Sequence, residues 1–219
     1  MEKKAIKALI LTVIFFMAGF NVTGQNSGND NNVEYLMKYL RSHWDDIHDV
    51  IMRFHMDDPA LKGTVFISMT WENGILENAV VDSNSTGNEQ FGPAIIEAMK
   101  NWKIPEIQDT WQIVVPFRTM IYGSDRPDFK EKGIFTGKVM TASGEPVAQA
   151  KVILDPVKGN PAKADTAITN REGIFIRTLI PPGIWEIRCI REGYQPFIIE
   201  DVDFKKKGHI KTSIILQAE

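Results

Sequence analysis

Histidines and aspartates crowd the stretch between residues 43 and 58, where their side chains have the chemistry to bind a metal ion. Imidazole nitrogens and carboxylate oxygens are common ligands of Zn²⁺. His43 and His48 are five positions apart, however, which places them on different faces of a helix, and no His-Glu-x-x-His pair occurs. We therefore expect no metal site and interpret the segment as an acidic, solvated helix face, formed by His43, His48, His55, Asp45, Asp46, Asp49, Asp57 and Asp58.

No other group of residues predicts catalysis. The sequence contains no Gly-x-Ser-x-Gly nucleophile motif and no phosphate-binding loop or dinucleotide fingerprint. Cys189 is the only cysteine, so it can form neither an internal disulfide nor a thiolate metal site. Its alternation with Trp185 and Ile187 predicts a buried place on one face of a strand. The sequence thus predicts a protein that is not an enzyme and has no catalytic residue, cofactor or metal.

The first 24 residues have the pattern of a secretory signal peptide. Lys3, Lys4 and Lys7 precede an almost wholly apolar segment, residues 8–20, and compact residues follow it. A membrane-spanning helix needs about 20 apolar residues, so we expect 1–24 to be cleaved, leaving no stable membrane span. We then expect the mature protein in the periplasm, either free or associated with the outer membrane. The net charge of −3 gives no electrostatic reason to expect nucleic acid as a partner.

Residues 33–122 predict a first domain of the α+β class. Apolar residues at spacings of three and four indicate helices over 33–54 and 90–102, and alternating residues indicate strands over 62–71, 75–82 and 110–121. Asn73-Gly74 between the first two strands is a strong hairpin signal. The sheet is therefore expected to be small and antiparallel, with two helices. Of its tryptophans, Trp71 and Trp102 are expected in the core and Trp111 to be exposed.

A period of two runs through the second half of the chain. The charged segment 123–132 is interpreted as a linker, and residues 133–219 are expected to form a second, all-β domain. Turn signals separate seven short segments of this kind, which is typical of a seven-stranded β-sandwich. The strands are predicted near 134–141, 149–155, 164–169, 173–179, 183–192, 195–203 and 209–217.

The first domain resembles the C-terminal domain of TonB-type energy transducers over about residues 55–122. The resemblance lies in the order and spacing of five segments: 63–68 (GTVFIS), 72–74 (ENG), 79–83 (AVVDS), 94–105 (AIIEAMKNWKIP) and 113–117 (IVVPF). Domains of this family bind short peptide segments of outer-membrane receptors and have no catalytic residues. The resemblance therefore implies a peptide partner, such as a receptor segment.

The second domain resembles the carboxypeptidase regulatory-like domain, a prealbumin-like sandwich, over about 134–218. The matching segments are 137–139 (GKV), 144–147 (GEPV), 150–152 (AKV), 169–175 (TNREGIF), 179–185 (LIPPGIW) and 192–194 (EGY). The family usually has Asp at the position of Asn170 and Tyr at the position of Trp185, both mild departures. The family name implies no peptidase activity. Gly173 and Gly183 stand where turns are expected to need a positive φ.

One strand of the first domain is the candidate binding site. Pro116 has no N–H and is tolerated mainly where a strand has a free side, so the third strand is expected at the sheet edge. An unpaired edge offers backbone N–H and C=O groups to an extended peptide. The alternative is an edge that Pro116 protects from any pairing. The candidate residues are Trp111, Gln112, Ile113, Val114, Val115, Pro116, Phe117, Arg118 and Thr119.

These observations favour an exported, non-catalytic protein-binding module of the bacterial envelope, accessory to TonB-dependent outer-membrane transport. A first alternative is an energy transducer anchored through residues 8–20. Residues 25–32 link the end of the predicted signal peptide to the first predicted helix, and these eight residues, when extended, span at most about 30 Å. The Pro-rich spacer expected of a transducer is absent. A second alternative is an envelope enzyme whose site has no recognisable motif.

Overall fold

The structure is a computed structural model that describes residues 30–121, 123–157, 159–204 and 208–219. The predicted signal peptide, and the anchor that is its alternative, lie outside these residues. Contacts divide the chain into two units. The first contains the described residues up to Ile51 together with Ala60–Ile121, and the second contains Met52–Pro59 and the residues after Ile121. The segment 52–59, which the sequence analysis placed in the first domain, is thus grouped with the second unit.

The helices of the first unit are α1 (Asp30–Ser42), α2 (Trp44–Asp57, whose last residues belong to the second unit) and α3 (Phe91–Met99). The single helix predicted over 33–54 is therefore two helices, because the helix is interrupted by a turn at His43. Pro93 lies in the first turn of α3, where its missing N–H costs no hydrogen bond. In the described part of the chain, no helix is long and apolar enough to cross a membrane.

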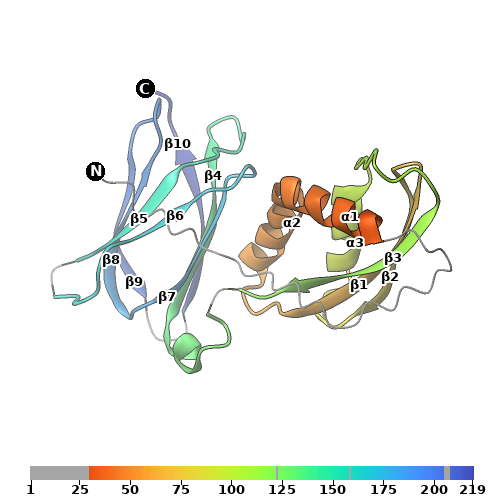
Figure 1. The fold of residues 1–219 in the computed structure, drawn as a ribbon. Coiled ribbons are helices and arrows are strands. Elements are labelled where there is room, and N and C mark those ends of the chain that lie inside the picture. Colours follow the sequence, from red (N-terminus) through yellow and green to blue (C-terminus); the bar gives the residue numbers. More distant parts are fainter. Residues whose placement is uncertain (1–29, 122, 158, 205–207) are drawn as a thin grey trace, which may run out of the picture. The chain divides into compact units, whose positions relative to one another are not determined.

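The sheet of the first unit has three antiparallel strands in the order β2-β1-β3 (Figure 1). Their bounds are β1 Gly63–Glu72, β2 Ile75–Asn84 and β3 Trp111–Thr119. The turn between β1 and β2 has φ of 48° at Asn73 and 76° at Gly74, as a two-residue type I′ hairpin requires. A Cβ on Gly74 would also lie 2.3 Å from the carbonyl oxygen of Ile104, so glycine is needed there for space as well as for φ.

One face of this sheet is buried and the other faces solvent. Along β1 the side chains of Val65, Ile67, Met69 and Trp71 are buried, and Figure 1 shows α1 and α3 on one side of the sheet. Trp71 and Trp102 are in the core, as predicted. The prediction for Trp111 was wrong, because it is only 3% exposed. It is paired with Trp71 across β1 and β3, and so its side chain shares the buried face.

The second unit is a seven-stranded sandwich. Its strands are β4 (Gly133–Thr141), β5 (Lys151–Pro156), β6 (Asp165–Ile168), β7 (Ile174–Ile180), β8 (Gly183–Ile190), β9 (Phe197–Phe204) and β10 (His209–Leu216). One sheet has the order β10-β4-β7 and the other β6-β5-β8-β9. The pair β10–β4 is parallel and the other pairs are antiparallel. A short 3-10 helix, Pro127–Glu131, lies in the predicted linker. The predicted class, α+β followed by an all-β sandwich, is confirmed.

Apolar side chains from both sheets fill the sandwich core. Phe135 packs on Phe175 and Phe204, with ring centroids 5.0 and 5.7 Å away. Trp185 is buried and its indole N–H donates to the carbonyl oxygen of Pro181 at 3.2 Å, so the large ring replaces the family's tyrosine without an unsatisfied polar group. Cys189 is buried in this core, as predicted. Burial raises the pKa of its thiol to about 11.

Candidate functional site

The strand β3 lies at one edge of the sheet of the first unit, and its nine residues are the nine candidate residues of the sequence analysis. Its alternate side chains point to opposite faces. Those of Trp111, Ile113, Val115, Phe117 and Thr119 are buried, whereas Gln112, Val114 and Arg118 are exposed and Pro116 is half-buried. The predicted edge position is confirmed. Peptide binding along this edge stays a prediction.

The direction of the backbone groups of β3 follows from hydrogen bonds at the other side of β1. The N–H of Thr64 donates to the hydroxyl oxygen of Ser85 at 2.9 Å, and its carbonyl oxygen accepts from the N–H of Ser85 at 3.0 Å. Both groups of Thr64 therefore point toward β2. Because backbone direction alternates along a strand, Val65 points toward β3. Val65 and its partner Phe117 thus form a hydrogen-bonded pair, and the next pair, Phe66 with Pro116, does not.

This alternation places the backbone groups of Gln112, Val114, Pro116 and Arg118 at the free side of the edge. Three of these residues offer both an N–H and a C=O, and Pro116 offers only its C=O. Among the described residues, no backbone group bonds to them from that side. Pro116 therefore costs the sheet no hydrogen bond, which explains in backbone terms why a proline is tolerated within β3.

The opposite edge of the same sheet is less suited to pairing. The register of β2 on β1 shifts twice, so that Asp82 and Glu77 are left without partners in the ladder. Such bulges, combined with acidic side chains, are devices that keep an edge from pairing with another strand. The register of β3 on β1 runs from Gly63–Thr119 to Trp71–Trp111 without a shift. Of the two edges, β3 is therefore the regular one.

The solvent-facing side of the sheet carries apolar side chains next to this edge. Phe66 is 42% exposed, Val80 50% and Val114 41%. Val80 and Val114 flank Ser68 in one row across the sheet, and Phe66 pairs with Pro116 in the next. The sequence analysis did not include Phe66 and Val80 among the candidate residues. Their signal was nevertheless present, since Phe66 is a large apolar residue among Thr64, Ser68 and Thr70 on the polar face of its strand.

The three histidines of the first two helices do not converge. His43 stacks on Tyr39 with ring centroids 3.8 Å apart, His48 lies by Trp44, and His55 is fully buried. Across the described ranges, no group of three or more His, Cys, Asp or Glu side chains is arranged to hold a metal ion. The expected solvated acidic face is only partly correct. Asp45 is exposed, whereas Asp49 is 6% exposed.

The burial of His55 affects its protonation. Burial lowers the pKa of its imidazole from 6.5 to about 4, and the nearby Asp58 offsets part of that effect. His209, on β10, also has a lowered pKa, through partial burial and the positive charge of Lys211. The Nε2 atom of His209 lies 2.8 Å from the hydroxyl of the buried Thr136, which is itself 3.1 Å from the carbonyl oxygen of Met56. Polar groups in this part of the second unit are thus engaged in internal contacts.

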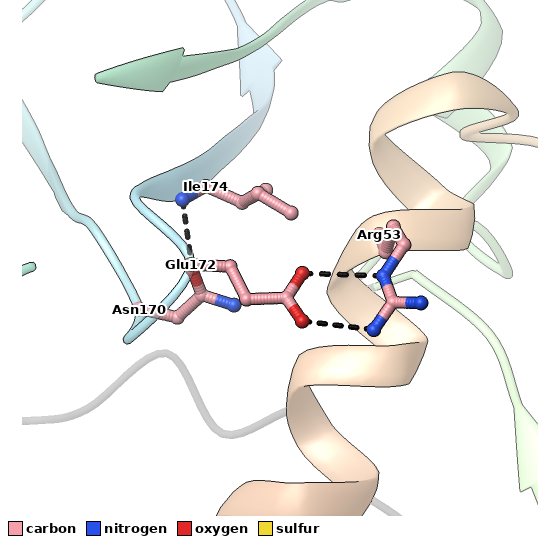
Figure 2. Close-up of polar contacts among 4 residues, drawn as sticks. All are labelled: Arg53, Asn170, Glu172 and Ile174. Carbon is pink, nitrogen blue, oxygen red and sulfur yellow. Dashed lines mark hydrogen bonds and ion pairs between the residues drawn. The ribbon is translucent and has the colours of Figure 1, made fainter. Parts of the chain in front are cut away.

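The turn before β7 is part of the family motif of the second domain, and its polar side chains also form internal contacts. The side-chain oxygen of Asn170 accepts the N–H of Ile174 at 2.7 Å, and a carboxylate oxygen has the same acceptor chemistry, so the departure from the family's aspartate keeps an acceptor at this position. Gly173 has φ of 74° and Gly183 of 146°, as predicted. Figure 2 shows Arg53, within the same unit, facing Glu172. Its guanidinium forms two hydrogen bonds to the carboxylate, of 3.2 and 2.8 Å, so this turn offers no free acidic group at Glu172.

Comparisons with known proteins found distant similarity to solved structures. A 3-chlorocatechol 1,2-dioxygenase from Rhodococcus opacus is 13% identical over 43% of this chain and 63% of its own, with a TM-score of 0.33. A cohesin–X-dockerin complex from Acetivibrio cellulolyticus is 17% identical over 39% and 58%, with a TM-score of 0.30. This chain thus spans less than two thirds of either structure. No curated protein matched. A family model matched residues 134–217, and the second unit of this protein accordingly contains a carboxypeptidase regulatory-like domain.

Proposed function

We propose that this protein is an exported, non-catalytic binding protein of the bacterial envelope whose first unit takes up an extended peptide by strand addition along β3. The observation that carries the proposal is the regular, unpaired edge of β3, with seven outward backbone groups on four alternate residues. An added strand forms hydrogen bonds with such a row of groups, and these bonds provide affinity that depends little on the peptide's side chains.

The side chains beside the edge support the same role. Val114, Pro116 and Phe66 form an apolar strip along β3 and β1 on the solvent-facing side. A peptide paired with β3 would place every second side chain next to this strip, because side chains alternate between faces. Exposed apolar side chains that adjoin unpaired backbone groups favour a protein or peptide partner over a small polar ligand.

The class of partner is proposed from the TonB resemblance of the first domain. That resemblance rests on the residues quoted in the sequence analysis, since the family match covers 134–217. It favours a segment from the periplasmic end of an outer-membrane receptor, and hence a role accessory to TonB-dependent transport. The second unit is proposed as a non-catalytic companion domain, because the carboxypeptidase regulatory-like family implies no peptidase activity.

Amide chemical-shift mapping tests strand addition directly. The mature chain, labelled with ¹⁵N, is titrated with peptides from the periplasmic ends of co-expressed receptors. We expect the largest shifts at Gln112, Val114 and Arg118, whose N–H groups face the free edge, and smaller shifts along β2. Shifts confined to β2 or to the sandwich would contradict strand addition on β3. Intact-mass measurement of the native protein tests export, with a chain that begins near Gln25 as the expected result.

A further inference from the structure

The pattern of donors along the β3 edge has a gap, and the gap has consequences for what can pair there. Gln112, Val114 and Arg118 each present an N–H to the free side, whereas Pro116 between the last two presents none. The acceptor row is complete, since all four residues keep their carbonyl oxygen. An antiparallel strand exchanges two hydrogen bonds with each outward residue. A peptide that spans the whole edge therefore forms one bond fewer than a regular strand would allow.

Pairing between two copies of this chain would lose more hydrogen bonds than the pairing of one copy with a peptide. In a two-fold antiparallel pairing of one β3 with another, each copy contributes the same residues to the interface. Every such register that includes Pro116 lacks its N–H once in each copy, so two bonds are missing. The longest register that avoids Pro116 is centred on Ile113 and uses only Gln112 and Val114. Pairing between two copies is thus either limited to this short register or lacks two hydrogen bonds. Pairing with a foreign strand lacks only one.

We propose that Pro116 is a specificity-determining residue of the β3 edge, which opposes pairing between two copies of this chain while allowing a single foreign strand to add. The proposal rests on the strand addition proposed above. The two alternatives given for this edge were that it binds a strand and that Pro116 protects it from pairing. One missing N–H is compatible with both, because it weakens pairing between copies and still allows a foreign strand to add. Its position supports this role, since the side chain stands on the solvent-facing side and the ladder to β1 does not use its N–H.

The test is the variant Pro116→Val, which restores the missing N–H with a residue that favours strands. Two quantities are measured on the mature chain. The first is the Kd of a receptor peptide that shifts the β3 amides, and the second is self-association, followed by sedimentation over a range of concentrations. We expect the peptide to bind roughly two- to tenfold more tightly, as for one added hydrogen bond. We also expect dimers at concentrations where the parent chain is monomeric.

A series of peptides with modified backbones tests for the same missing N–H of Pro116, with the change made in the ligand instead of the protein. N-methylation removes single N–H groups from the peptide in turn, and every second position should weaken binding because only alternate N–H groups face β3. In the parent chain an ester that weakens the carbonyl opposite Pro116 should leave the Kd unchanged. In the Pro116→Val chain the same ester should weaken binding several-fold, because that carbonyl then accepts a hydrogen bond.

The outcomes separate the two proposals. If no peptide shifts the β3 amides, strand addition is wrong, and self-association of Pro116→Val still tests the role of the proline. If peptides add to β3 with an unchanged Kd in a folded Pro116→Val chain that stays monomeric, the role proposed for Pro116 is wrong while strand addition stands. Circular dichroism and the melting temperature establish that the variant is folded. A second variant, Pro116→Thr, serves if the valine variant precipitates.

Discussion

Lowering the pH should destabilise this protein through the buried side chain of His55. Its pKa is about 4 in the folded chain, against 6.5 for an unperturbed histidine. The unfolded chain therefore binds a proton at a higher pH than the folded chain does. Its contribution to stability is complete above pH 6.5, declines as the pH falls toward 4, and does not decline further below that.

The size of the effect follows from the two pKa values. A difference of about 2.5 units corresponds to roughly 3 kcal/mol when the pH is below both values, and about 2 kcal/mol of this is already lost at pH 5. The partial exposure of His209, whose pKa is also lowered, makes its contribution to the same trend smaller. Of these two histidines, His55 should therefore account for the larger loss of stability between pH 7.5 and 5.

Urea unfolding of the parent chain and of His55→Phe at pH 7.5 and 5.0 measures this contribution. Phenylalanine keeps a ring of similar shape and removes the titration. We expect the free energy of unfolding of the parent chain to fall by about 2 kcal/mol more than that of the variant. His48→Phe, at a half-buried position of the same helix, is the matched control for replacing a histidine ring by phenylalanine. Equal losses in all three chains would refute the reasoning.

Three further predictions concern single positions. Val115→Pro removes a hydrogen bond from the β1–β3 ladder and should cost roughly 3 kcal/mol, whereas Val114→Pro removes only an outward donor and should leave the melting temperature within a few degrees while weakening peptide binding. If both variants melt alike, the assigned direction of the backbone groups is wrong. Cys189, with a pKa of about 11, should resist iodoacetamide at pH 8 in the native chain and react within minutes in guanidinium; rapid native labelling would show that it is accessible. Gly173→Ala places a Cβ 2.3 Å from the carbonyl oxygen of Val139 at a φ of 74°, and should lower stability by at least about 2 kcal/mol in chemical unfolding; an unchanged midpoint would contradict this.

Local patterns predicted most of the elements because their signals are short-range. The period of two located all seven sandwich strands, and Asn73-Gly74 placed the hairpin, since the positive φ values are a property of those two residues. Pro116 placed β3 at the sheet edge because the missing donor belongs to that residue. Each of these signals can be read without knowing what the segment packs against.

The features that could not be predicted from the sequence depend on contacts between distant segments. Trp111 was expected to be exposed at the start of a strand, but its pairing with Trp71 turns it to the buried face. The free direction of the β3 backbone depends on the bonds between Thr64 and Ser85, 21 residues apart. The break at His43 and the burial of Asp49 likewise depend on what surrounds the helices, because the apolar spacing continues through the break.

The parallel pairing of β4 with β10 bears on how the sandwich acquires its structure. Ile134 of the first sandwich strand is opposite His209 of the last, so five other strands must be accommodated before this pair can close. Loops of such length carry a large closure entropy, and folds rich in distant pairings fold slowly. A chain lacking β10 leaves an edge of β4 open and the core of the sandwich incomplete. Such a domain cannot finish folding while its last strand is still being synthesised, so the sandwich folds only after β10 (His209–Leu216) is available to pair with β4.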